Sequence, residues 1–202
     1  MTAQPSKPVK PEAAIDGRRL RSETSRLRIV EAMLALVSEG HVLPSAEAVA
    51  TRAGVGLRTV FRLFEDMDGV YRGMQAVMTG MLGGLLDGPI EAPDWRAALD
   101  ILIARRAEAF EILLPLQIAA DGQRQRSQAL REGRVRLVRG QRDTLAAVLP
   151  PAVHADADLM DALDLALSFE AWRRLRTDQG ADLATAARVM RRTALTLLAD
   201  VS

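Results

Sequence analysis

The sequence contains no cysteine and only two histidines. Without thiols, the chain cannot build disulfide frameworks, thiolate zinc sites, iron–sulfur clusters or cysteine nucleophiles. Two histidines leave little material for a His-based metal site or a catalytic triad. No apolar run approaches the roughly 20 residues that a membrane-spanning helix needs, and the Pro-rich N-terminus lacks the apolar middle of a signal peptide. These absences predict a soluble, cytoplasmic protein with no membrane partner.

The composition favours helices. Of the 202 residues, 49% are hydrophobic and 26% are charged, which is enough apolar material for a sizeable core. Alanine, leucine and arginine account for 86 residues, whereas valine, isoleucine and threonine account for only 32. This balance predicts an all-α fold and disfavours a sandwich or a barrel.

Charge is nearly balanced overall but uneven along the chain. The formal net charge is +1, so the whole molecule carries no field that would attract a polyanion. Two segments, 1–28 and 121–143, each carry seven basic residues against three acidic ones. For 121–143 we favour a solvated helix face. The basic residues in 1–28 are candidates for a functional role, because a possible DNA-binding motif follows them.

Glycine and proline residues that end predicted helices divide the chain into three parts, an N-terminal arm, a small head and a larger body. Residues 1–17 are rich in proline and predict a disordered arm, residues 18–66 predict a three-helix head, and residues 67–202 predict a helical body. Apolar spacing at three and four residues predicts the individual helices. The expected helices cover about 22–39, 45–53, 57–64, 66–85, 95–115, 123–149, 156–178 and 182–200.

Residues 45–64 contain the pattern of a helix-turn-helix motif. Ser45 is a natural N-cap for the first helix, and Gly54 accommodates a tight turn before the second helix. The second helix then exposes Arg58 and Arg62, which share a face because they are four residues apart. Arginine suits guanine edges and phosphates, so this pattern predicts a DNA-reading helix.

The motif resembles the DNA-binding domain of the TetR family of bacterial transcriptional regulators. The family pattern places Ala-Gly-Val before the recognition helix, followed by a threonine, an aromatic residue and a phenylalanine at fixed spacing. This sequence has Ala53-Gly54-Val55, Thr59, Phe61 and Phe64 at those positions. The resemblance covers about residues 25–71 at the level of motifs. Over the remaining chain it is architectural.

Four residues depart from the family pattern. Gly56 replaces the serine that usually caps the recognition helix, and Phe61 replaces a tyrosine whose hydroxyl typically binds a phosphate. Leu63 replaces a histidine, and Met67 replaces a lysine at the start of the next helix. We expect arginines to take over the phosphate contacts, which set affinity and its salt dependence. The expected DNA-binding residues are Arg18, Arg19, Arg21, Ser45, Gly56, Leu57, Arg58, Thr59, Phe61 and Arg62.

The arginines that precede the first helix have two interpretations. They resemble the minor-groove arms that precede other helical DNA-binding heads. They are also typical of a solubilising tail. The sequence leaves both interpretations open.

The TetR resemblance implies a body that forms a homodimer and binds a small molecule. Segment 156–178 is apolar on two faces, and a helix of that kind must bury both of them. The final helix, 182–200, has small alanines at a heptad-like spacing that would let a partner approach closely. The expected interface residues are Leu163, Leu165, Trp172, Met190, Ala194 and Leu197.

A ligand pocket is more weakly indicated. Methionines recur along 66–85 and adapt to irregular shapes, although such a stripe is more often ordinary core. The expected pocket residues are Met74, Met78, Met81, Leu102, Arg106, Phe110, Phe169 and Trp172.

Enzymatic readings find little support. His154, Asp156 and Asp158 are the only compact set of possible ligands, and they lie at a predicted helix start where aspartates cap. There is no phosphate-binding glycine loop. We therefore expect no enzyme activity, no metal and no cofactor.

Together these features predict an all-α, TetR-like homodimeric regulator, a repressor on the family pattern. It would bind a near-palindromic operator in double-stranded DNA and be released by a small-molecule effector. The alternative is a TetR-fold carrier of a small molecule or lipid that has lost DNA binding. The departures at Phe61, Leu63 and Met67 favour the carrier, whereas the arginines on the recognition face favour the regulator.

Overall fold

The computed structural model describes residues 12–201, with side chains from Arg19 onward. Regular structure in this part of the chain is entirely helical, which confirms the all-α prediction. The helices are α1 (Glu12–Ser38), α2 (Ala46–Ala53), α3 (Leu57–Phe64), α4 (Met67–Leu86), α5 (Trp95–Asp121), α6 (Gln128–Val148), α7 (Pro151–His154), α8 (Ala157–Ala166), α9 (Phe169–Arg173) and α10 (Leu183–Leu197). A π-helical turn, η1 (Arg174–Asp178), continues α9.

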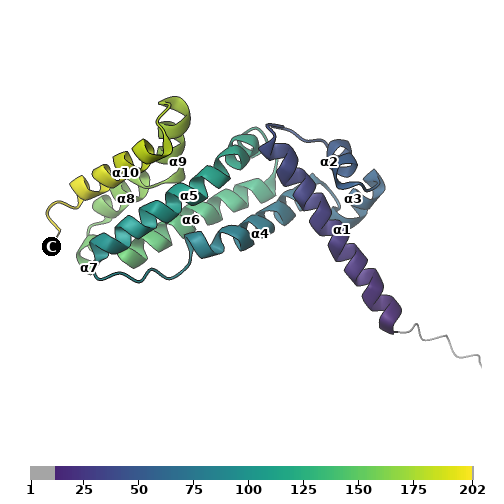
Figure 1. The fold of residues 1–202 in the computed structure, drawn as a ribbon, viewed down its shortest axis with the longest axis horizontal. Helices are drawn as coiled ribbons and strands as arrows, with labels where there is room; N and C mark the ends of the chain where they lie inside the picture. The colour runs from purple at the N-terminus through teal and green to yellow at the C-terminus, as the bar shows by residue number, and fades with distance from the viewer. Residues whose placement is uncertain (1–11, 202) are drawn as a thin grey trace, which may run out of the picture.

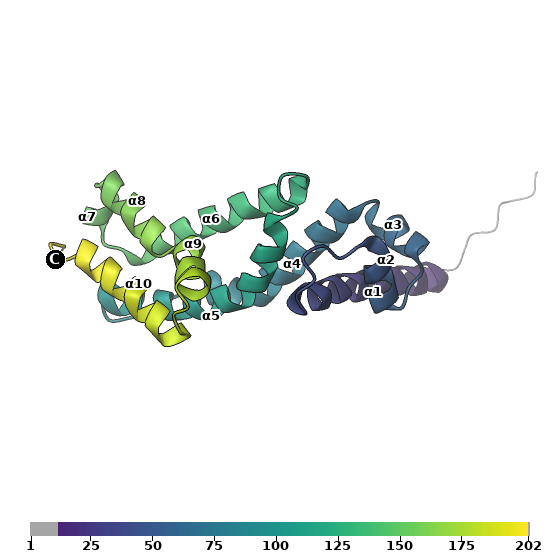
Figure 2. The same ribbon diagram turned by 90° about the horizontal axis from the view of Figure 1, so that it is seen from above.

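The molecule is elongated, with its two ends joined by long helices (Figure 1). Helices α1, α2 and α3 gather at one end, and α7, α8, α9 and α10 lie at the other (Figures 1 and 2). Helices α4, α5 and α6 run lengthwise between them, and α4 contacts α1, α3, α5 and α6. Buried side chains form one continuous cluster from α1 to α10.

Helix α1 begins about ten residues earlier than the sequence predicts. The prediction placed its start near Ser22 and a disordered arm over 1–17, of which residues 1–11 lie outside the described part. Local bonds explain the added turns: the Thr24 and Ser25 hydroxyls donate to carbonyls four residues earlier, and Arg19 pairs with Glu23 at 3.1 Å. Pro11 is the last proline before Pro44, so no ring interrupts this stretch.

The predicted single helix over 156–178 is wrong, because the chain breaks after α8. Ser168 has an extended backbone, and its Oγ accepts the Ala171 N–H, which makes it the N-cap of α9. The same hydroxyl donates to the Leu165 carbonyl at 2.8 Å. A serine that satisfies both helix ends in this way favours a cap over continued helix.

Helix α5 runs through Pro115 rather than ending there. Pro115 is exposed, while Leu113, Leu116 and Ala119 on either side of it are buried. Burial of this face offsets the hydrogen bond that proline cannot donate.

Candidate nucleic-acid interface and internal cavity

Helices α2 and α3 are joined by a tight turn that the sequence dictates. Ser45 caps α2 by accepting the Ala48 N–H at 3.2 Å. Gly54 adopts a left-handed φ of 63°, and the Val55 N–H returns to the Ala50 carbonyl at 3.0 Å. A glycine is the natural residue for that backbone conformation. The turn therefore holds α3 at a fixed angle across α2.

Helix α3 has one buried face and one exposed face. Val60, Leu63 and Phe64 pack into the core of the head. The opposite face exposes Leu57, Arg58, Phe61 and Arg62, and Thr59 is half-buried beside them. Gly56 occupies the N-cap position without a side-chain bond. The predicted surface residues of α3 are thus brought together on one side of a single short helix.

Three of the four departures from the TetR pattern differ in how far the structure exposes them. Leu63 is buried, so its side chain contributes to packing rather than to the surface. Phe61 is 42% exposed and presents an apolar ring on the outer face of α3. Met67 is half-buried at the start of α4. Of these three residues, only Phe61 is exposed.

The basic residues before the motif lie on a helix, not on an extended arm. Arg19 and Arg21 are exposed on α1, which projects past α2 and α3 in Figure 1. The side chain of Arg18 lies outside the described residues. A helix is about 10–12 Å across, whereas the minor groove is about 6 Å wide. Arg19 and Arg21 therefore differ from an extended minor-groove arm, because they lie on a helix whose backbone is too wide to enter that groove.

The start of α4 is fixed tightly to the end of α3. Asp66 caps α4 by accepting the Gly69 N–H at 2.8 Å. A Cβ added to Gly69 would lie 2.0 Å from the Phe64 carbonyl oxygen, and one added to Gly73 would lie 2.9 Å from Val30. Only glycine permits approaches this close. The start of α4 is therefore packed directly against α1 and α3.

Polar bonds join α4 to the first half of α6. The Gln75 amide donates to the Ala129 carbonyl at 2.9 Å and accepts from Arg136 at 2.7 Å. Asp68 accepts the Ala129 N–H at 3.1 Å. Burial raises the pKa of Asp68, but hydrogen bonds from Ser127 and the start of α6, with Arg72 nearby, leave that pKa below its ordinary value. Asp68 is thus held as a carboxylate at the start of α6.

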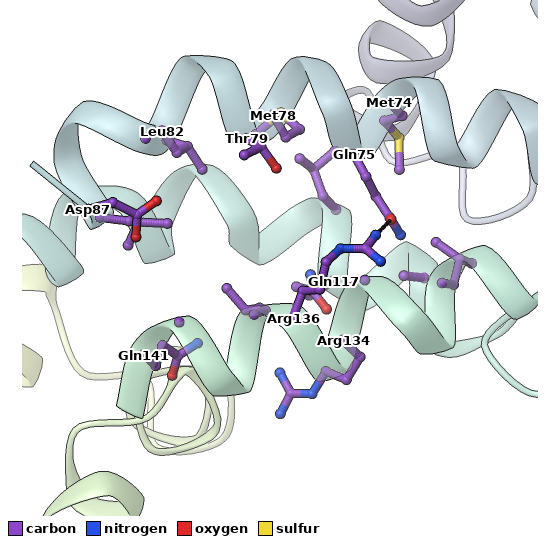
Figure 3. A pocket seen from close by; sticks show the side chains of 18 of the residues that line it. Met74, Gln75, Met78, Thr79, Leu82, Asp87, Gln117, Arg134, Arg136 and Gln141 are labelled. Atoms are coloured by element: carbon purple, nitrogen blue, oxygen red, sulfur yellow. Dashed lines mark hydrogen bonds between the residues drawn. The ribbon is translucent and has the colours of Figure 1, made fainter. Parts of the chain in front are cut away.

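A cavity of about 240 Å³ lies between α4, α5 and α6 (Figure 3). Its α4 wall is largely apolar, and its α6 wall carries arginines and amides. The lining residues are Met74, Gln75, Met78, Thr79, Leu82, Gly83, Leu86, Asp87, Leu116, Gln117, Ala120, Leu130, Gly133, Arg134, Arg136, Leu137, Gly140, Gln141 and Thr144.

The structure places two of the eight predicted pocket residues, Met74 and Met78, in this lining. Met81 is 64% exposed on the far side of α4, so its assignment is wrong. The other five are buried in the core behind the cavity and do not line it: Leu102, Arg106, Phe110, Phe169 and Trp172. The aromatic side chains pack on each other, and the rings of Phe110 and Phe169 meet edge to face with their centroids 5.6 Å apart.

The polar residues of α6 were missed because 121–143 was interpreted as a solvated face. Much of that face is exposed, including Arg131, Arg136 and Arg139. Arg134 and Gln141 are not, and they line the cavity, with Arg136 at its exposed edge. A signal was present: Gly133 and Gly140 lie seven residues apart and therefore share one face of α6. A face with two missing side chains is typical of a close approach or of an opening.

Arg106 is an unusual core residue. It is 1% exposed, and its guanidinium donates to the carbonyls of Leu167 and Gln141 and, at 3.3 Å, to the Thr144 hydroxyl. Within residues 19–201 no carboxylate lies within ion-pair distance of it. Burial lowers the pKa of Arg106 to about 10, and the more distant Asp164 opposes this change. Arg106 is therefore still a cation at neutral pH, held by neutral acceptors.

Four of the six predicted interface residues lie inside the single chain. Leu163, Trp172, Met190 and Ala194 are buried, and the Trp172 indole donates to Glu111 at 2.8 Å. These four side chains therefore do not fit the predicted partner contacts: Trp172 turns inward on α9 after the Ser168 cap, and the other three lie on the buried faces of α8 and α10. Leu165 and Leu197 are exposed on α8 and α10.

No group of three or more metal-ligating side chains was found among the described residues. The helices of residues 12–201 include none with the length and apolarity to cross a membrane.

Comparison with known proteins gives a fold relationship. No family model matches the sequence, and no curated protein matches it. The structure is similar to the crystal structure of a transcriptional regulator from Rhodococcus sp. Rha1, with a TM-score of 0.65 and 17% identity. The match covers 89% of this chain and 96% of the regulator. The chain therefore shares its all-helical fold with a transcriptional regulator over nearly its whole length.

Proposed function

We propose that the protein is a homodimeric transcriptional regulator of the TetR type. It binds a near-palindromic operator through α2 and α3, and a small molecule held between α4, α5 and α6 releases it. The observation that carries the proposal is the exposed face of α3, where Arg58 and Arg62 lie together while the opposite face is buried. The fold shared with a regulator supports it.

Helix α3 has the dimensions and chemistry of a recognition helix. Its two turns fit the major groove, with arginines suited to guanine O6 and N7 and Thr59 to base edges or methyl groups. The amides at the start of α2, with the Ser45 hydroxyl, suit a phosphate. Arg19 and Arg21 on α1 would add phosphate contacts.

The dimer is proposed to form through α8 and α10. Leu165 is 70% exposed, and Val189 and Leu197 are exposed on the neighbouring α10. These helices lie at the end far from α2 and α3 in Figure 1, which suits a two-fold pairing that presents two heads to one side of DNA.

Sedimentation of Leu165→Arg tests this interface. We expect the variant to be monomeric, because a charge would be buried at the centre of the contact. The matched control is Val135→Arg, which changes an apolar residue 58% exposed on α6 and should leave the dimer intact. A dimeric Leu165→Arg, or equal loss in both variants, would place the interface elsewhere.

Release by a ligand would act through α4. The cavity borders Met74 and Met78, and the same helix is fixed to α3 at Gly69. A ligand that fits the cavity in only one position of α4 would bias the spacing of the two heads.

A carrier without DNA binding is the second candidate, and the exposed Phe61 ring favours it. Fluorescence anisotropy of random duplex DNA at several salt concentrations separates the two. A regulator shows binding that weakens steeply with salt and falls in Arg58→Ala, whereas a carrier shows neither.

A further inference from the structure

The wall that α6 contributes to the cavity contains a hydrogen-bond donor without a protein acceptor. Gln141 is 4% exposed and lines the cavity. Its Nε2 meets no acceptor among the residues that the structure describes. Figure 3 shows the Gln141 amide with its nitrogen on the side facing α4.

The orientation of that amide is fixed from behind. Gln141 Oε1 accepts the N–H of Phe169 at 3.1 Å. Phe169 is the first residue of α9, and an N–H at that position has no acceptor within its own helix. Turning the amide over would bring two donors together, so Nε2 lies at the end of the amide away from the Phe169 N–H, on the side of α4 (Figure 3). A buried donor gains free energy from any acceptor that a ligand brings to it.

The surroundings of Gln141 favour an acceptor with negative charge. Its own carbonyl accepts from Arg106, a buried cation with no carboxylate partner in the described part of the chain. Arg134 and Arg136 also line the cavity. Arg134 pairs with Glu170, and Arg136 donates to the neutral Gln75 amide. The lining contains one acid, Asp87, which is exposed at the far end of α4.

The remaining wall is apolar and the space is small. Met74, Met78 and Leu82 face it from α4, and Leu116 and Leu137 face it from α5 and α6. A volume of about 240 Å³ is slightly below the roughly 300–1,000 Å³ of typical drug-sized sites. A cavity of this volume suits a short flexible chain better than a rigid polycyclic molecule.

We propose that the cavity binds a small amphipathic carboxylic acid. Its carboxylate accepts the Gln141 Nε2–H in the field of Arg106, and its apolar chain lies along α4. The proposal rests on the ligand-responsive function proposed above and names the chemical class of its effector.

The test measures head-group preference by isothermal titration of the full-length chain, without DNA, at neutral pH. Octanoate, octan-1-ol and octylamine share one tail and differ in charge. We expect octanoate to bind at least about tenfold more tightly than the alcohol, as a charged hydrogen bond predicts, and octylamine to bind most weakly. This ranking uses the unmutated protein and so does not depend on the folding of a variant.

Gln141→Glu sharpens the assignment. The glutamate keeps an oxygen for the Phe169 N–H and replaces the cavity-facing donor by negative charge. Octanoate affinity should fall at least about tenfold, and octylamine should gain. Gln125→Glu is the matched control, because it makes the same charge change at an exposed residue outside the lining and should alter neither affinity.

Equal affinities for octanoate and octanol, or an unchanged Gln141→Glu, would overturn the proposal. Failure of all three probes to bind a protein that still selects DNA would overturn it while the regulator function stands. Octanoate binding through Gln141 by a protein that selects no DNA would support this site and refute the regulator function.

Discussion

Replacing Gly69 by alanine is expected to destabilise the protein through the junction of α3 and α4. The added Cβ would lie 2.0 Å from the Phe64 carbonyl oxygen. A carbon–oxygen contact normally measures about 3.3 Å or more. The two helices must therefore separate by more than about 1 Å, and the obstructing atom is backbone, which cannot rotate away as a side chain can.

The magnitude follows from two opposing effects. Alanine in place of glycine within a helix gains about 1 kcal/mol from propensity. Overpacking against a rigid neighbour costs about 1–3 kcal/mol or more. With backbone on both sides, we expect the cost to exceed the gain and the free energy of unfolding to fall by about 2 kcal/mol.

Gly80→Ala provides the control on the same helix. A Cβ there meets nothing within 4 Å, so this variant should gain about 0.5–1 kcal/mol. Urea unfolding of both variants measures the difference through the midpoint at constant slope. If the two variants gained stability equally, the close approach at Gly69 and the rigid joint between α3 and α4 would both be refuted.

Three further predictions concern single side chains. Arg58→Ala should weaken operator binding by about 1–3 kcal/mol and relax one base preference in titrations of substituted operators. Arg139 is exposed on α6, and Arg139→Ala should change neither quantity. An equal loss of affinity in both variants would contradict a role of Arg58 in reading bases. Glu65 ends α3 with a φ of 67° and a ψ of −55°, so Glu65→Gly should raise the free energy of unfolding by about 1 kcal/mol. Glu47→Gly within α2 should lower it by a similar amount. If urea unfolding showed a lower free energy of unfolding for both variants, backbone strain at Glu65 would be refuted. Hydrogen bonding from Arg176 holds the pKa of Glu111 below its ordinary value of 4.5, against burial, so this pair should stabilise the fold at neutral pH and lose that effect as the pH falls below about 4.5. Glu111→Gln should therefore reduce how steeply Tm falls as the pH is lowered below about 4.5. An unchanged dependence of Tm on pH in that range would refute the role of this pair.

Local signals made the head predictable from the sequence. The Ser45 cap, the Gly54 turn and the apolar spacing of α3 act within a few residues of each other, and the structure has each of them. Arg58 and Arg62 follow directly, because exposure on an amphipathic helix is set by its 3.6-residue period. The start of α1 was less accessible, since weak bonds such as Arg19–Glu23 had to be weighed against three prolines.

Tertiary packing made the body hard to predict. Trp172 and Phe169 look like interface or pocket residues in a continuous helix, but the cap at Ser168 turns them into the core against Phe110. Gln141 shows the converse. Its environment depends on α9, which follows 28 residues later in the chain. The two glycines of α6 mark a face of that helix, but they do not indicate that Gln141 is buried.

Selection from random duplex DNA shows whether this chain reads DNA through α3. Protein purified through unfolding and refolding, which removes any bound effector, would be incubated with the library at moderate salt, and the retained sequences determined. We expect a two-fold symmetric motif with half-sites about one helical turn or a multiple of it apart. The variant that combines Arg58→Ala with Arg62→Ala should not select it. Recovery of sequences no different from the starting library would contradict DNA reading through α3.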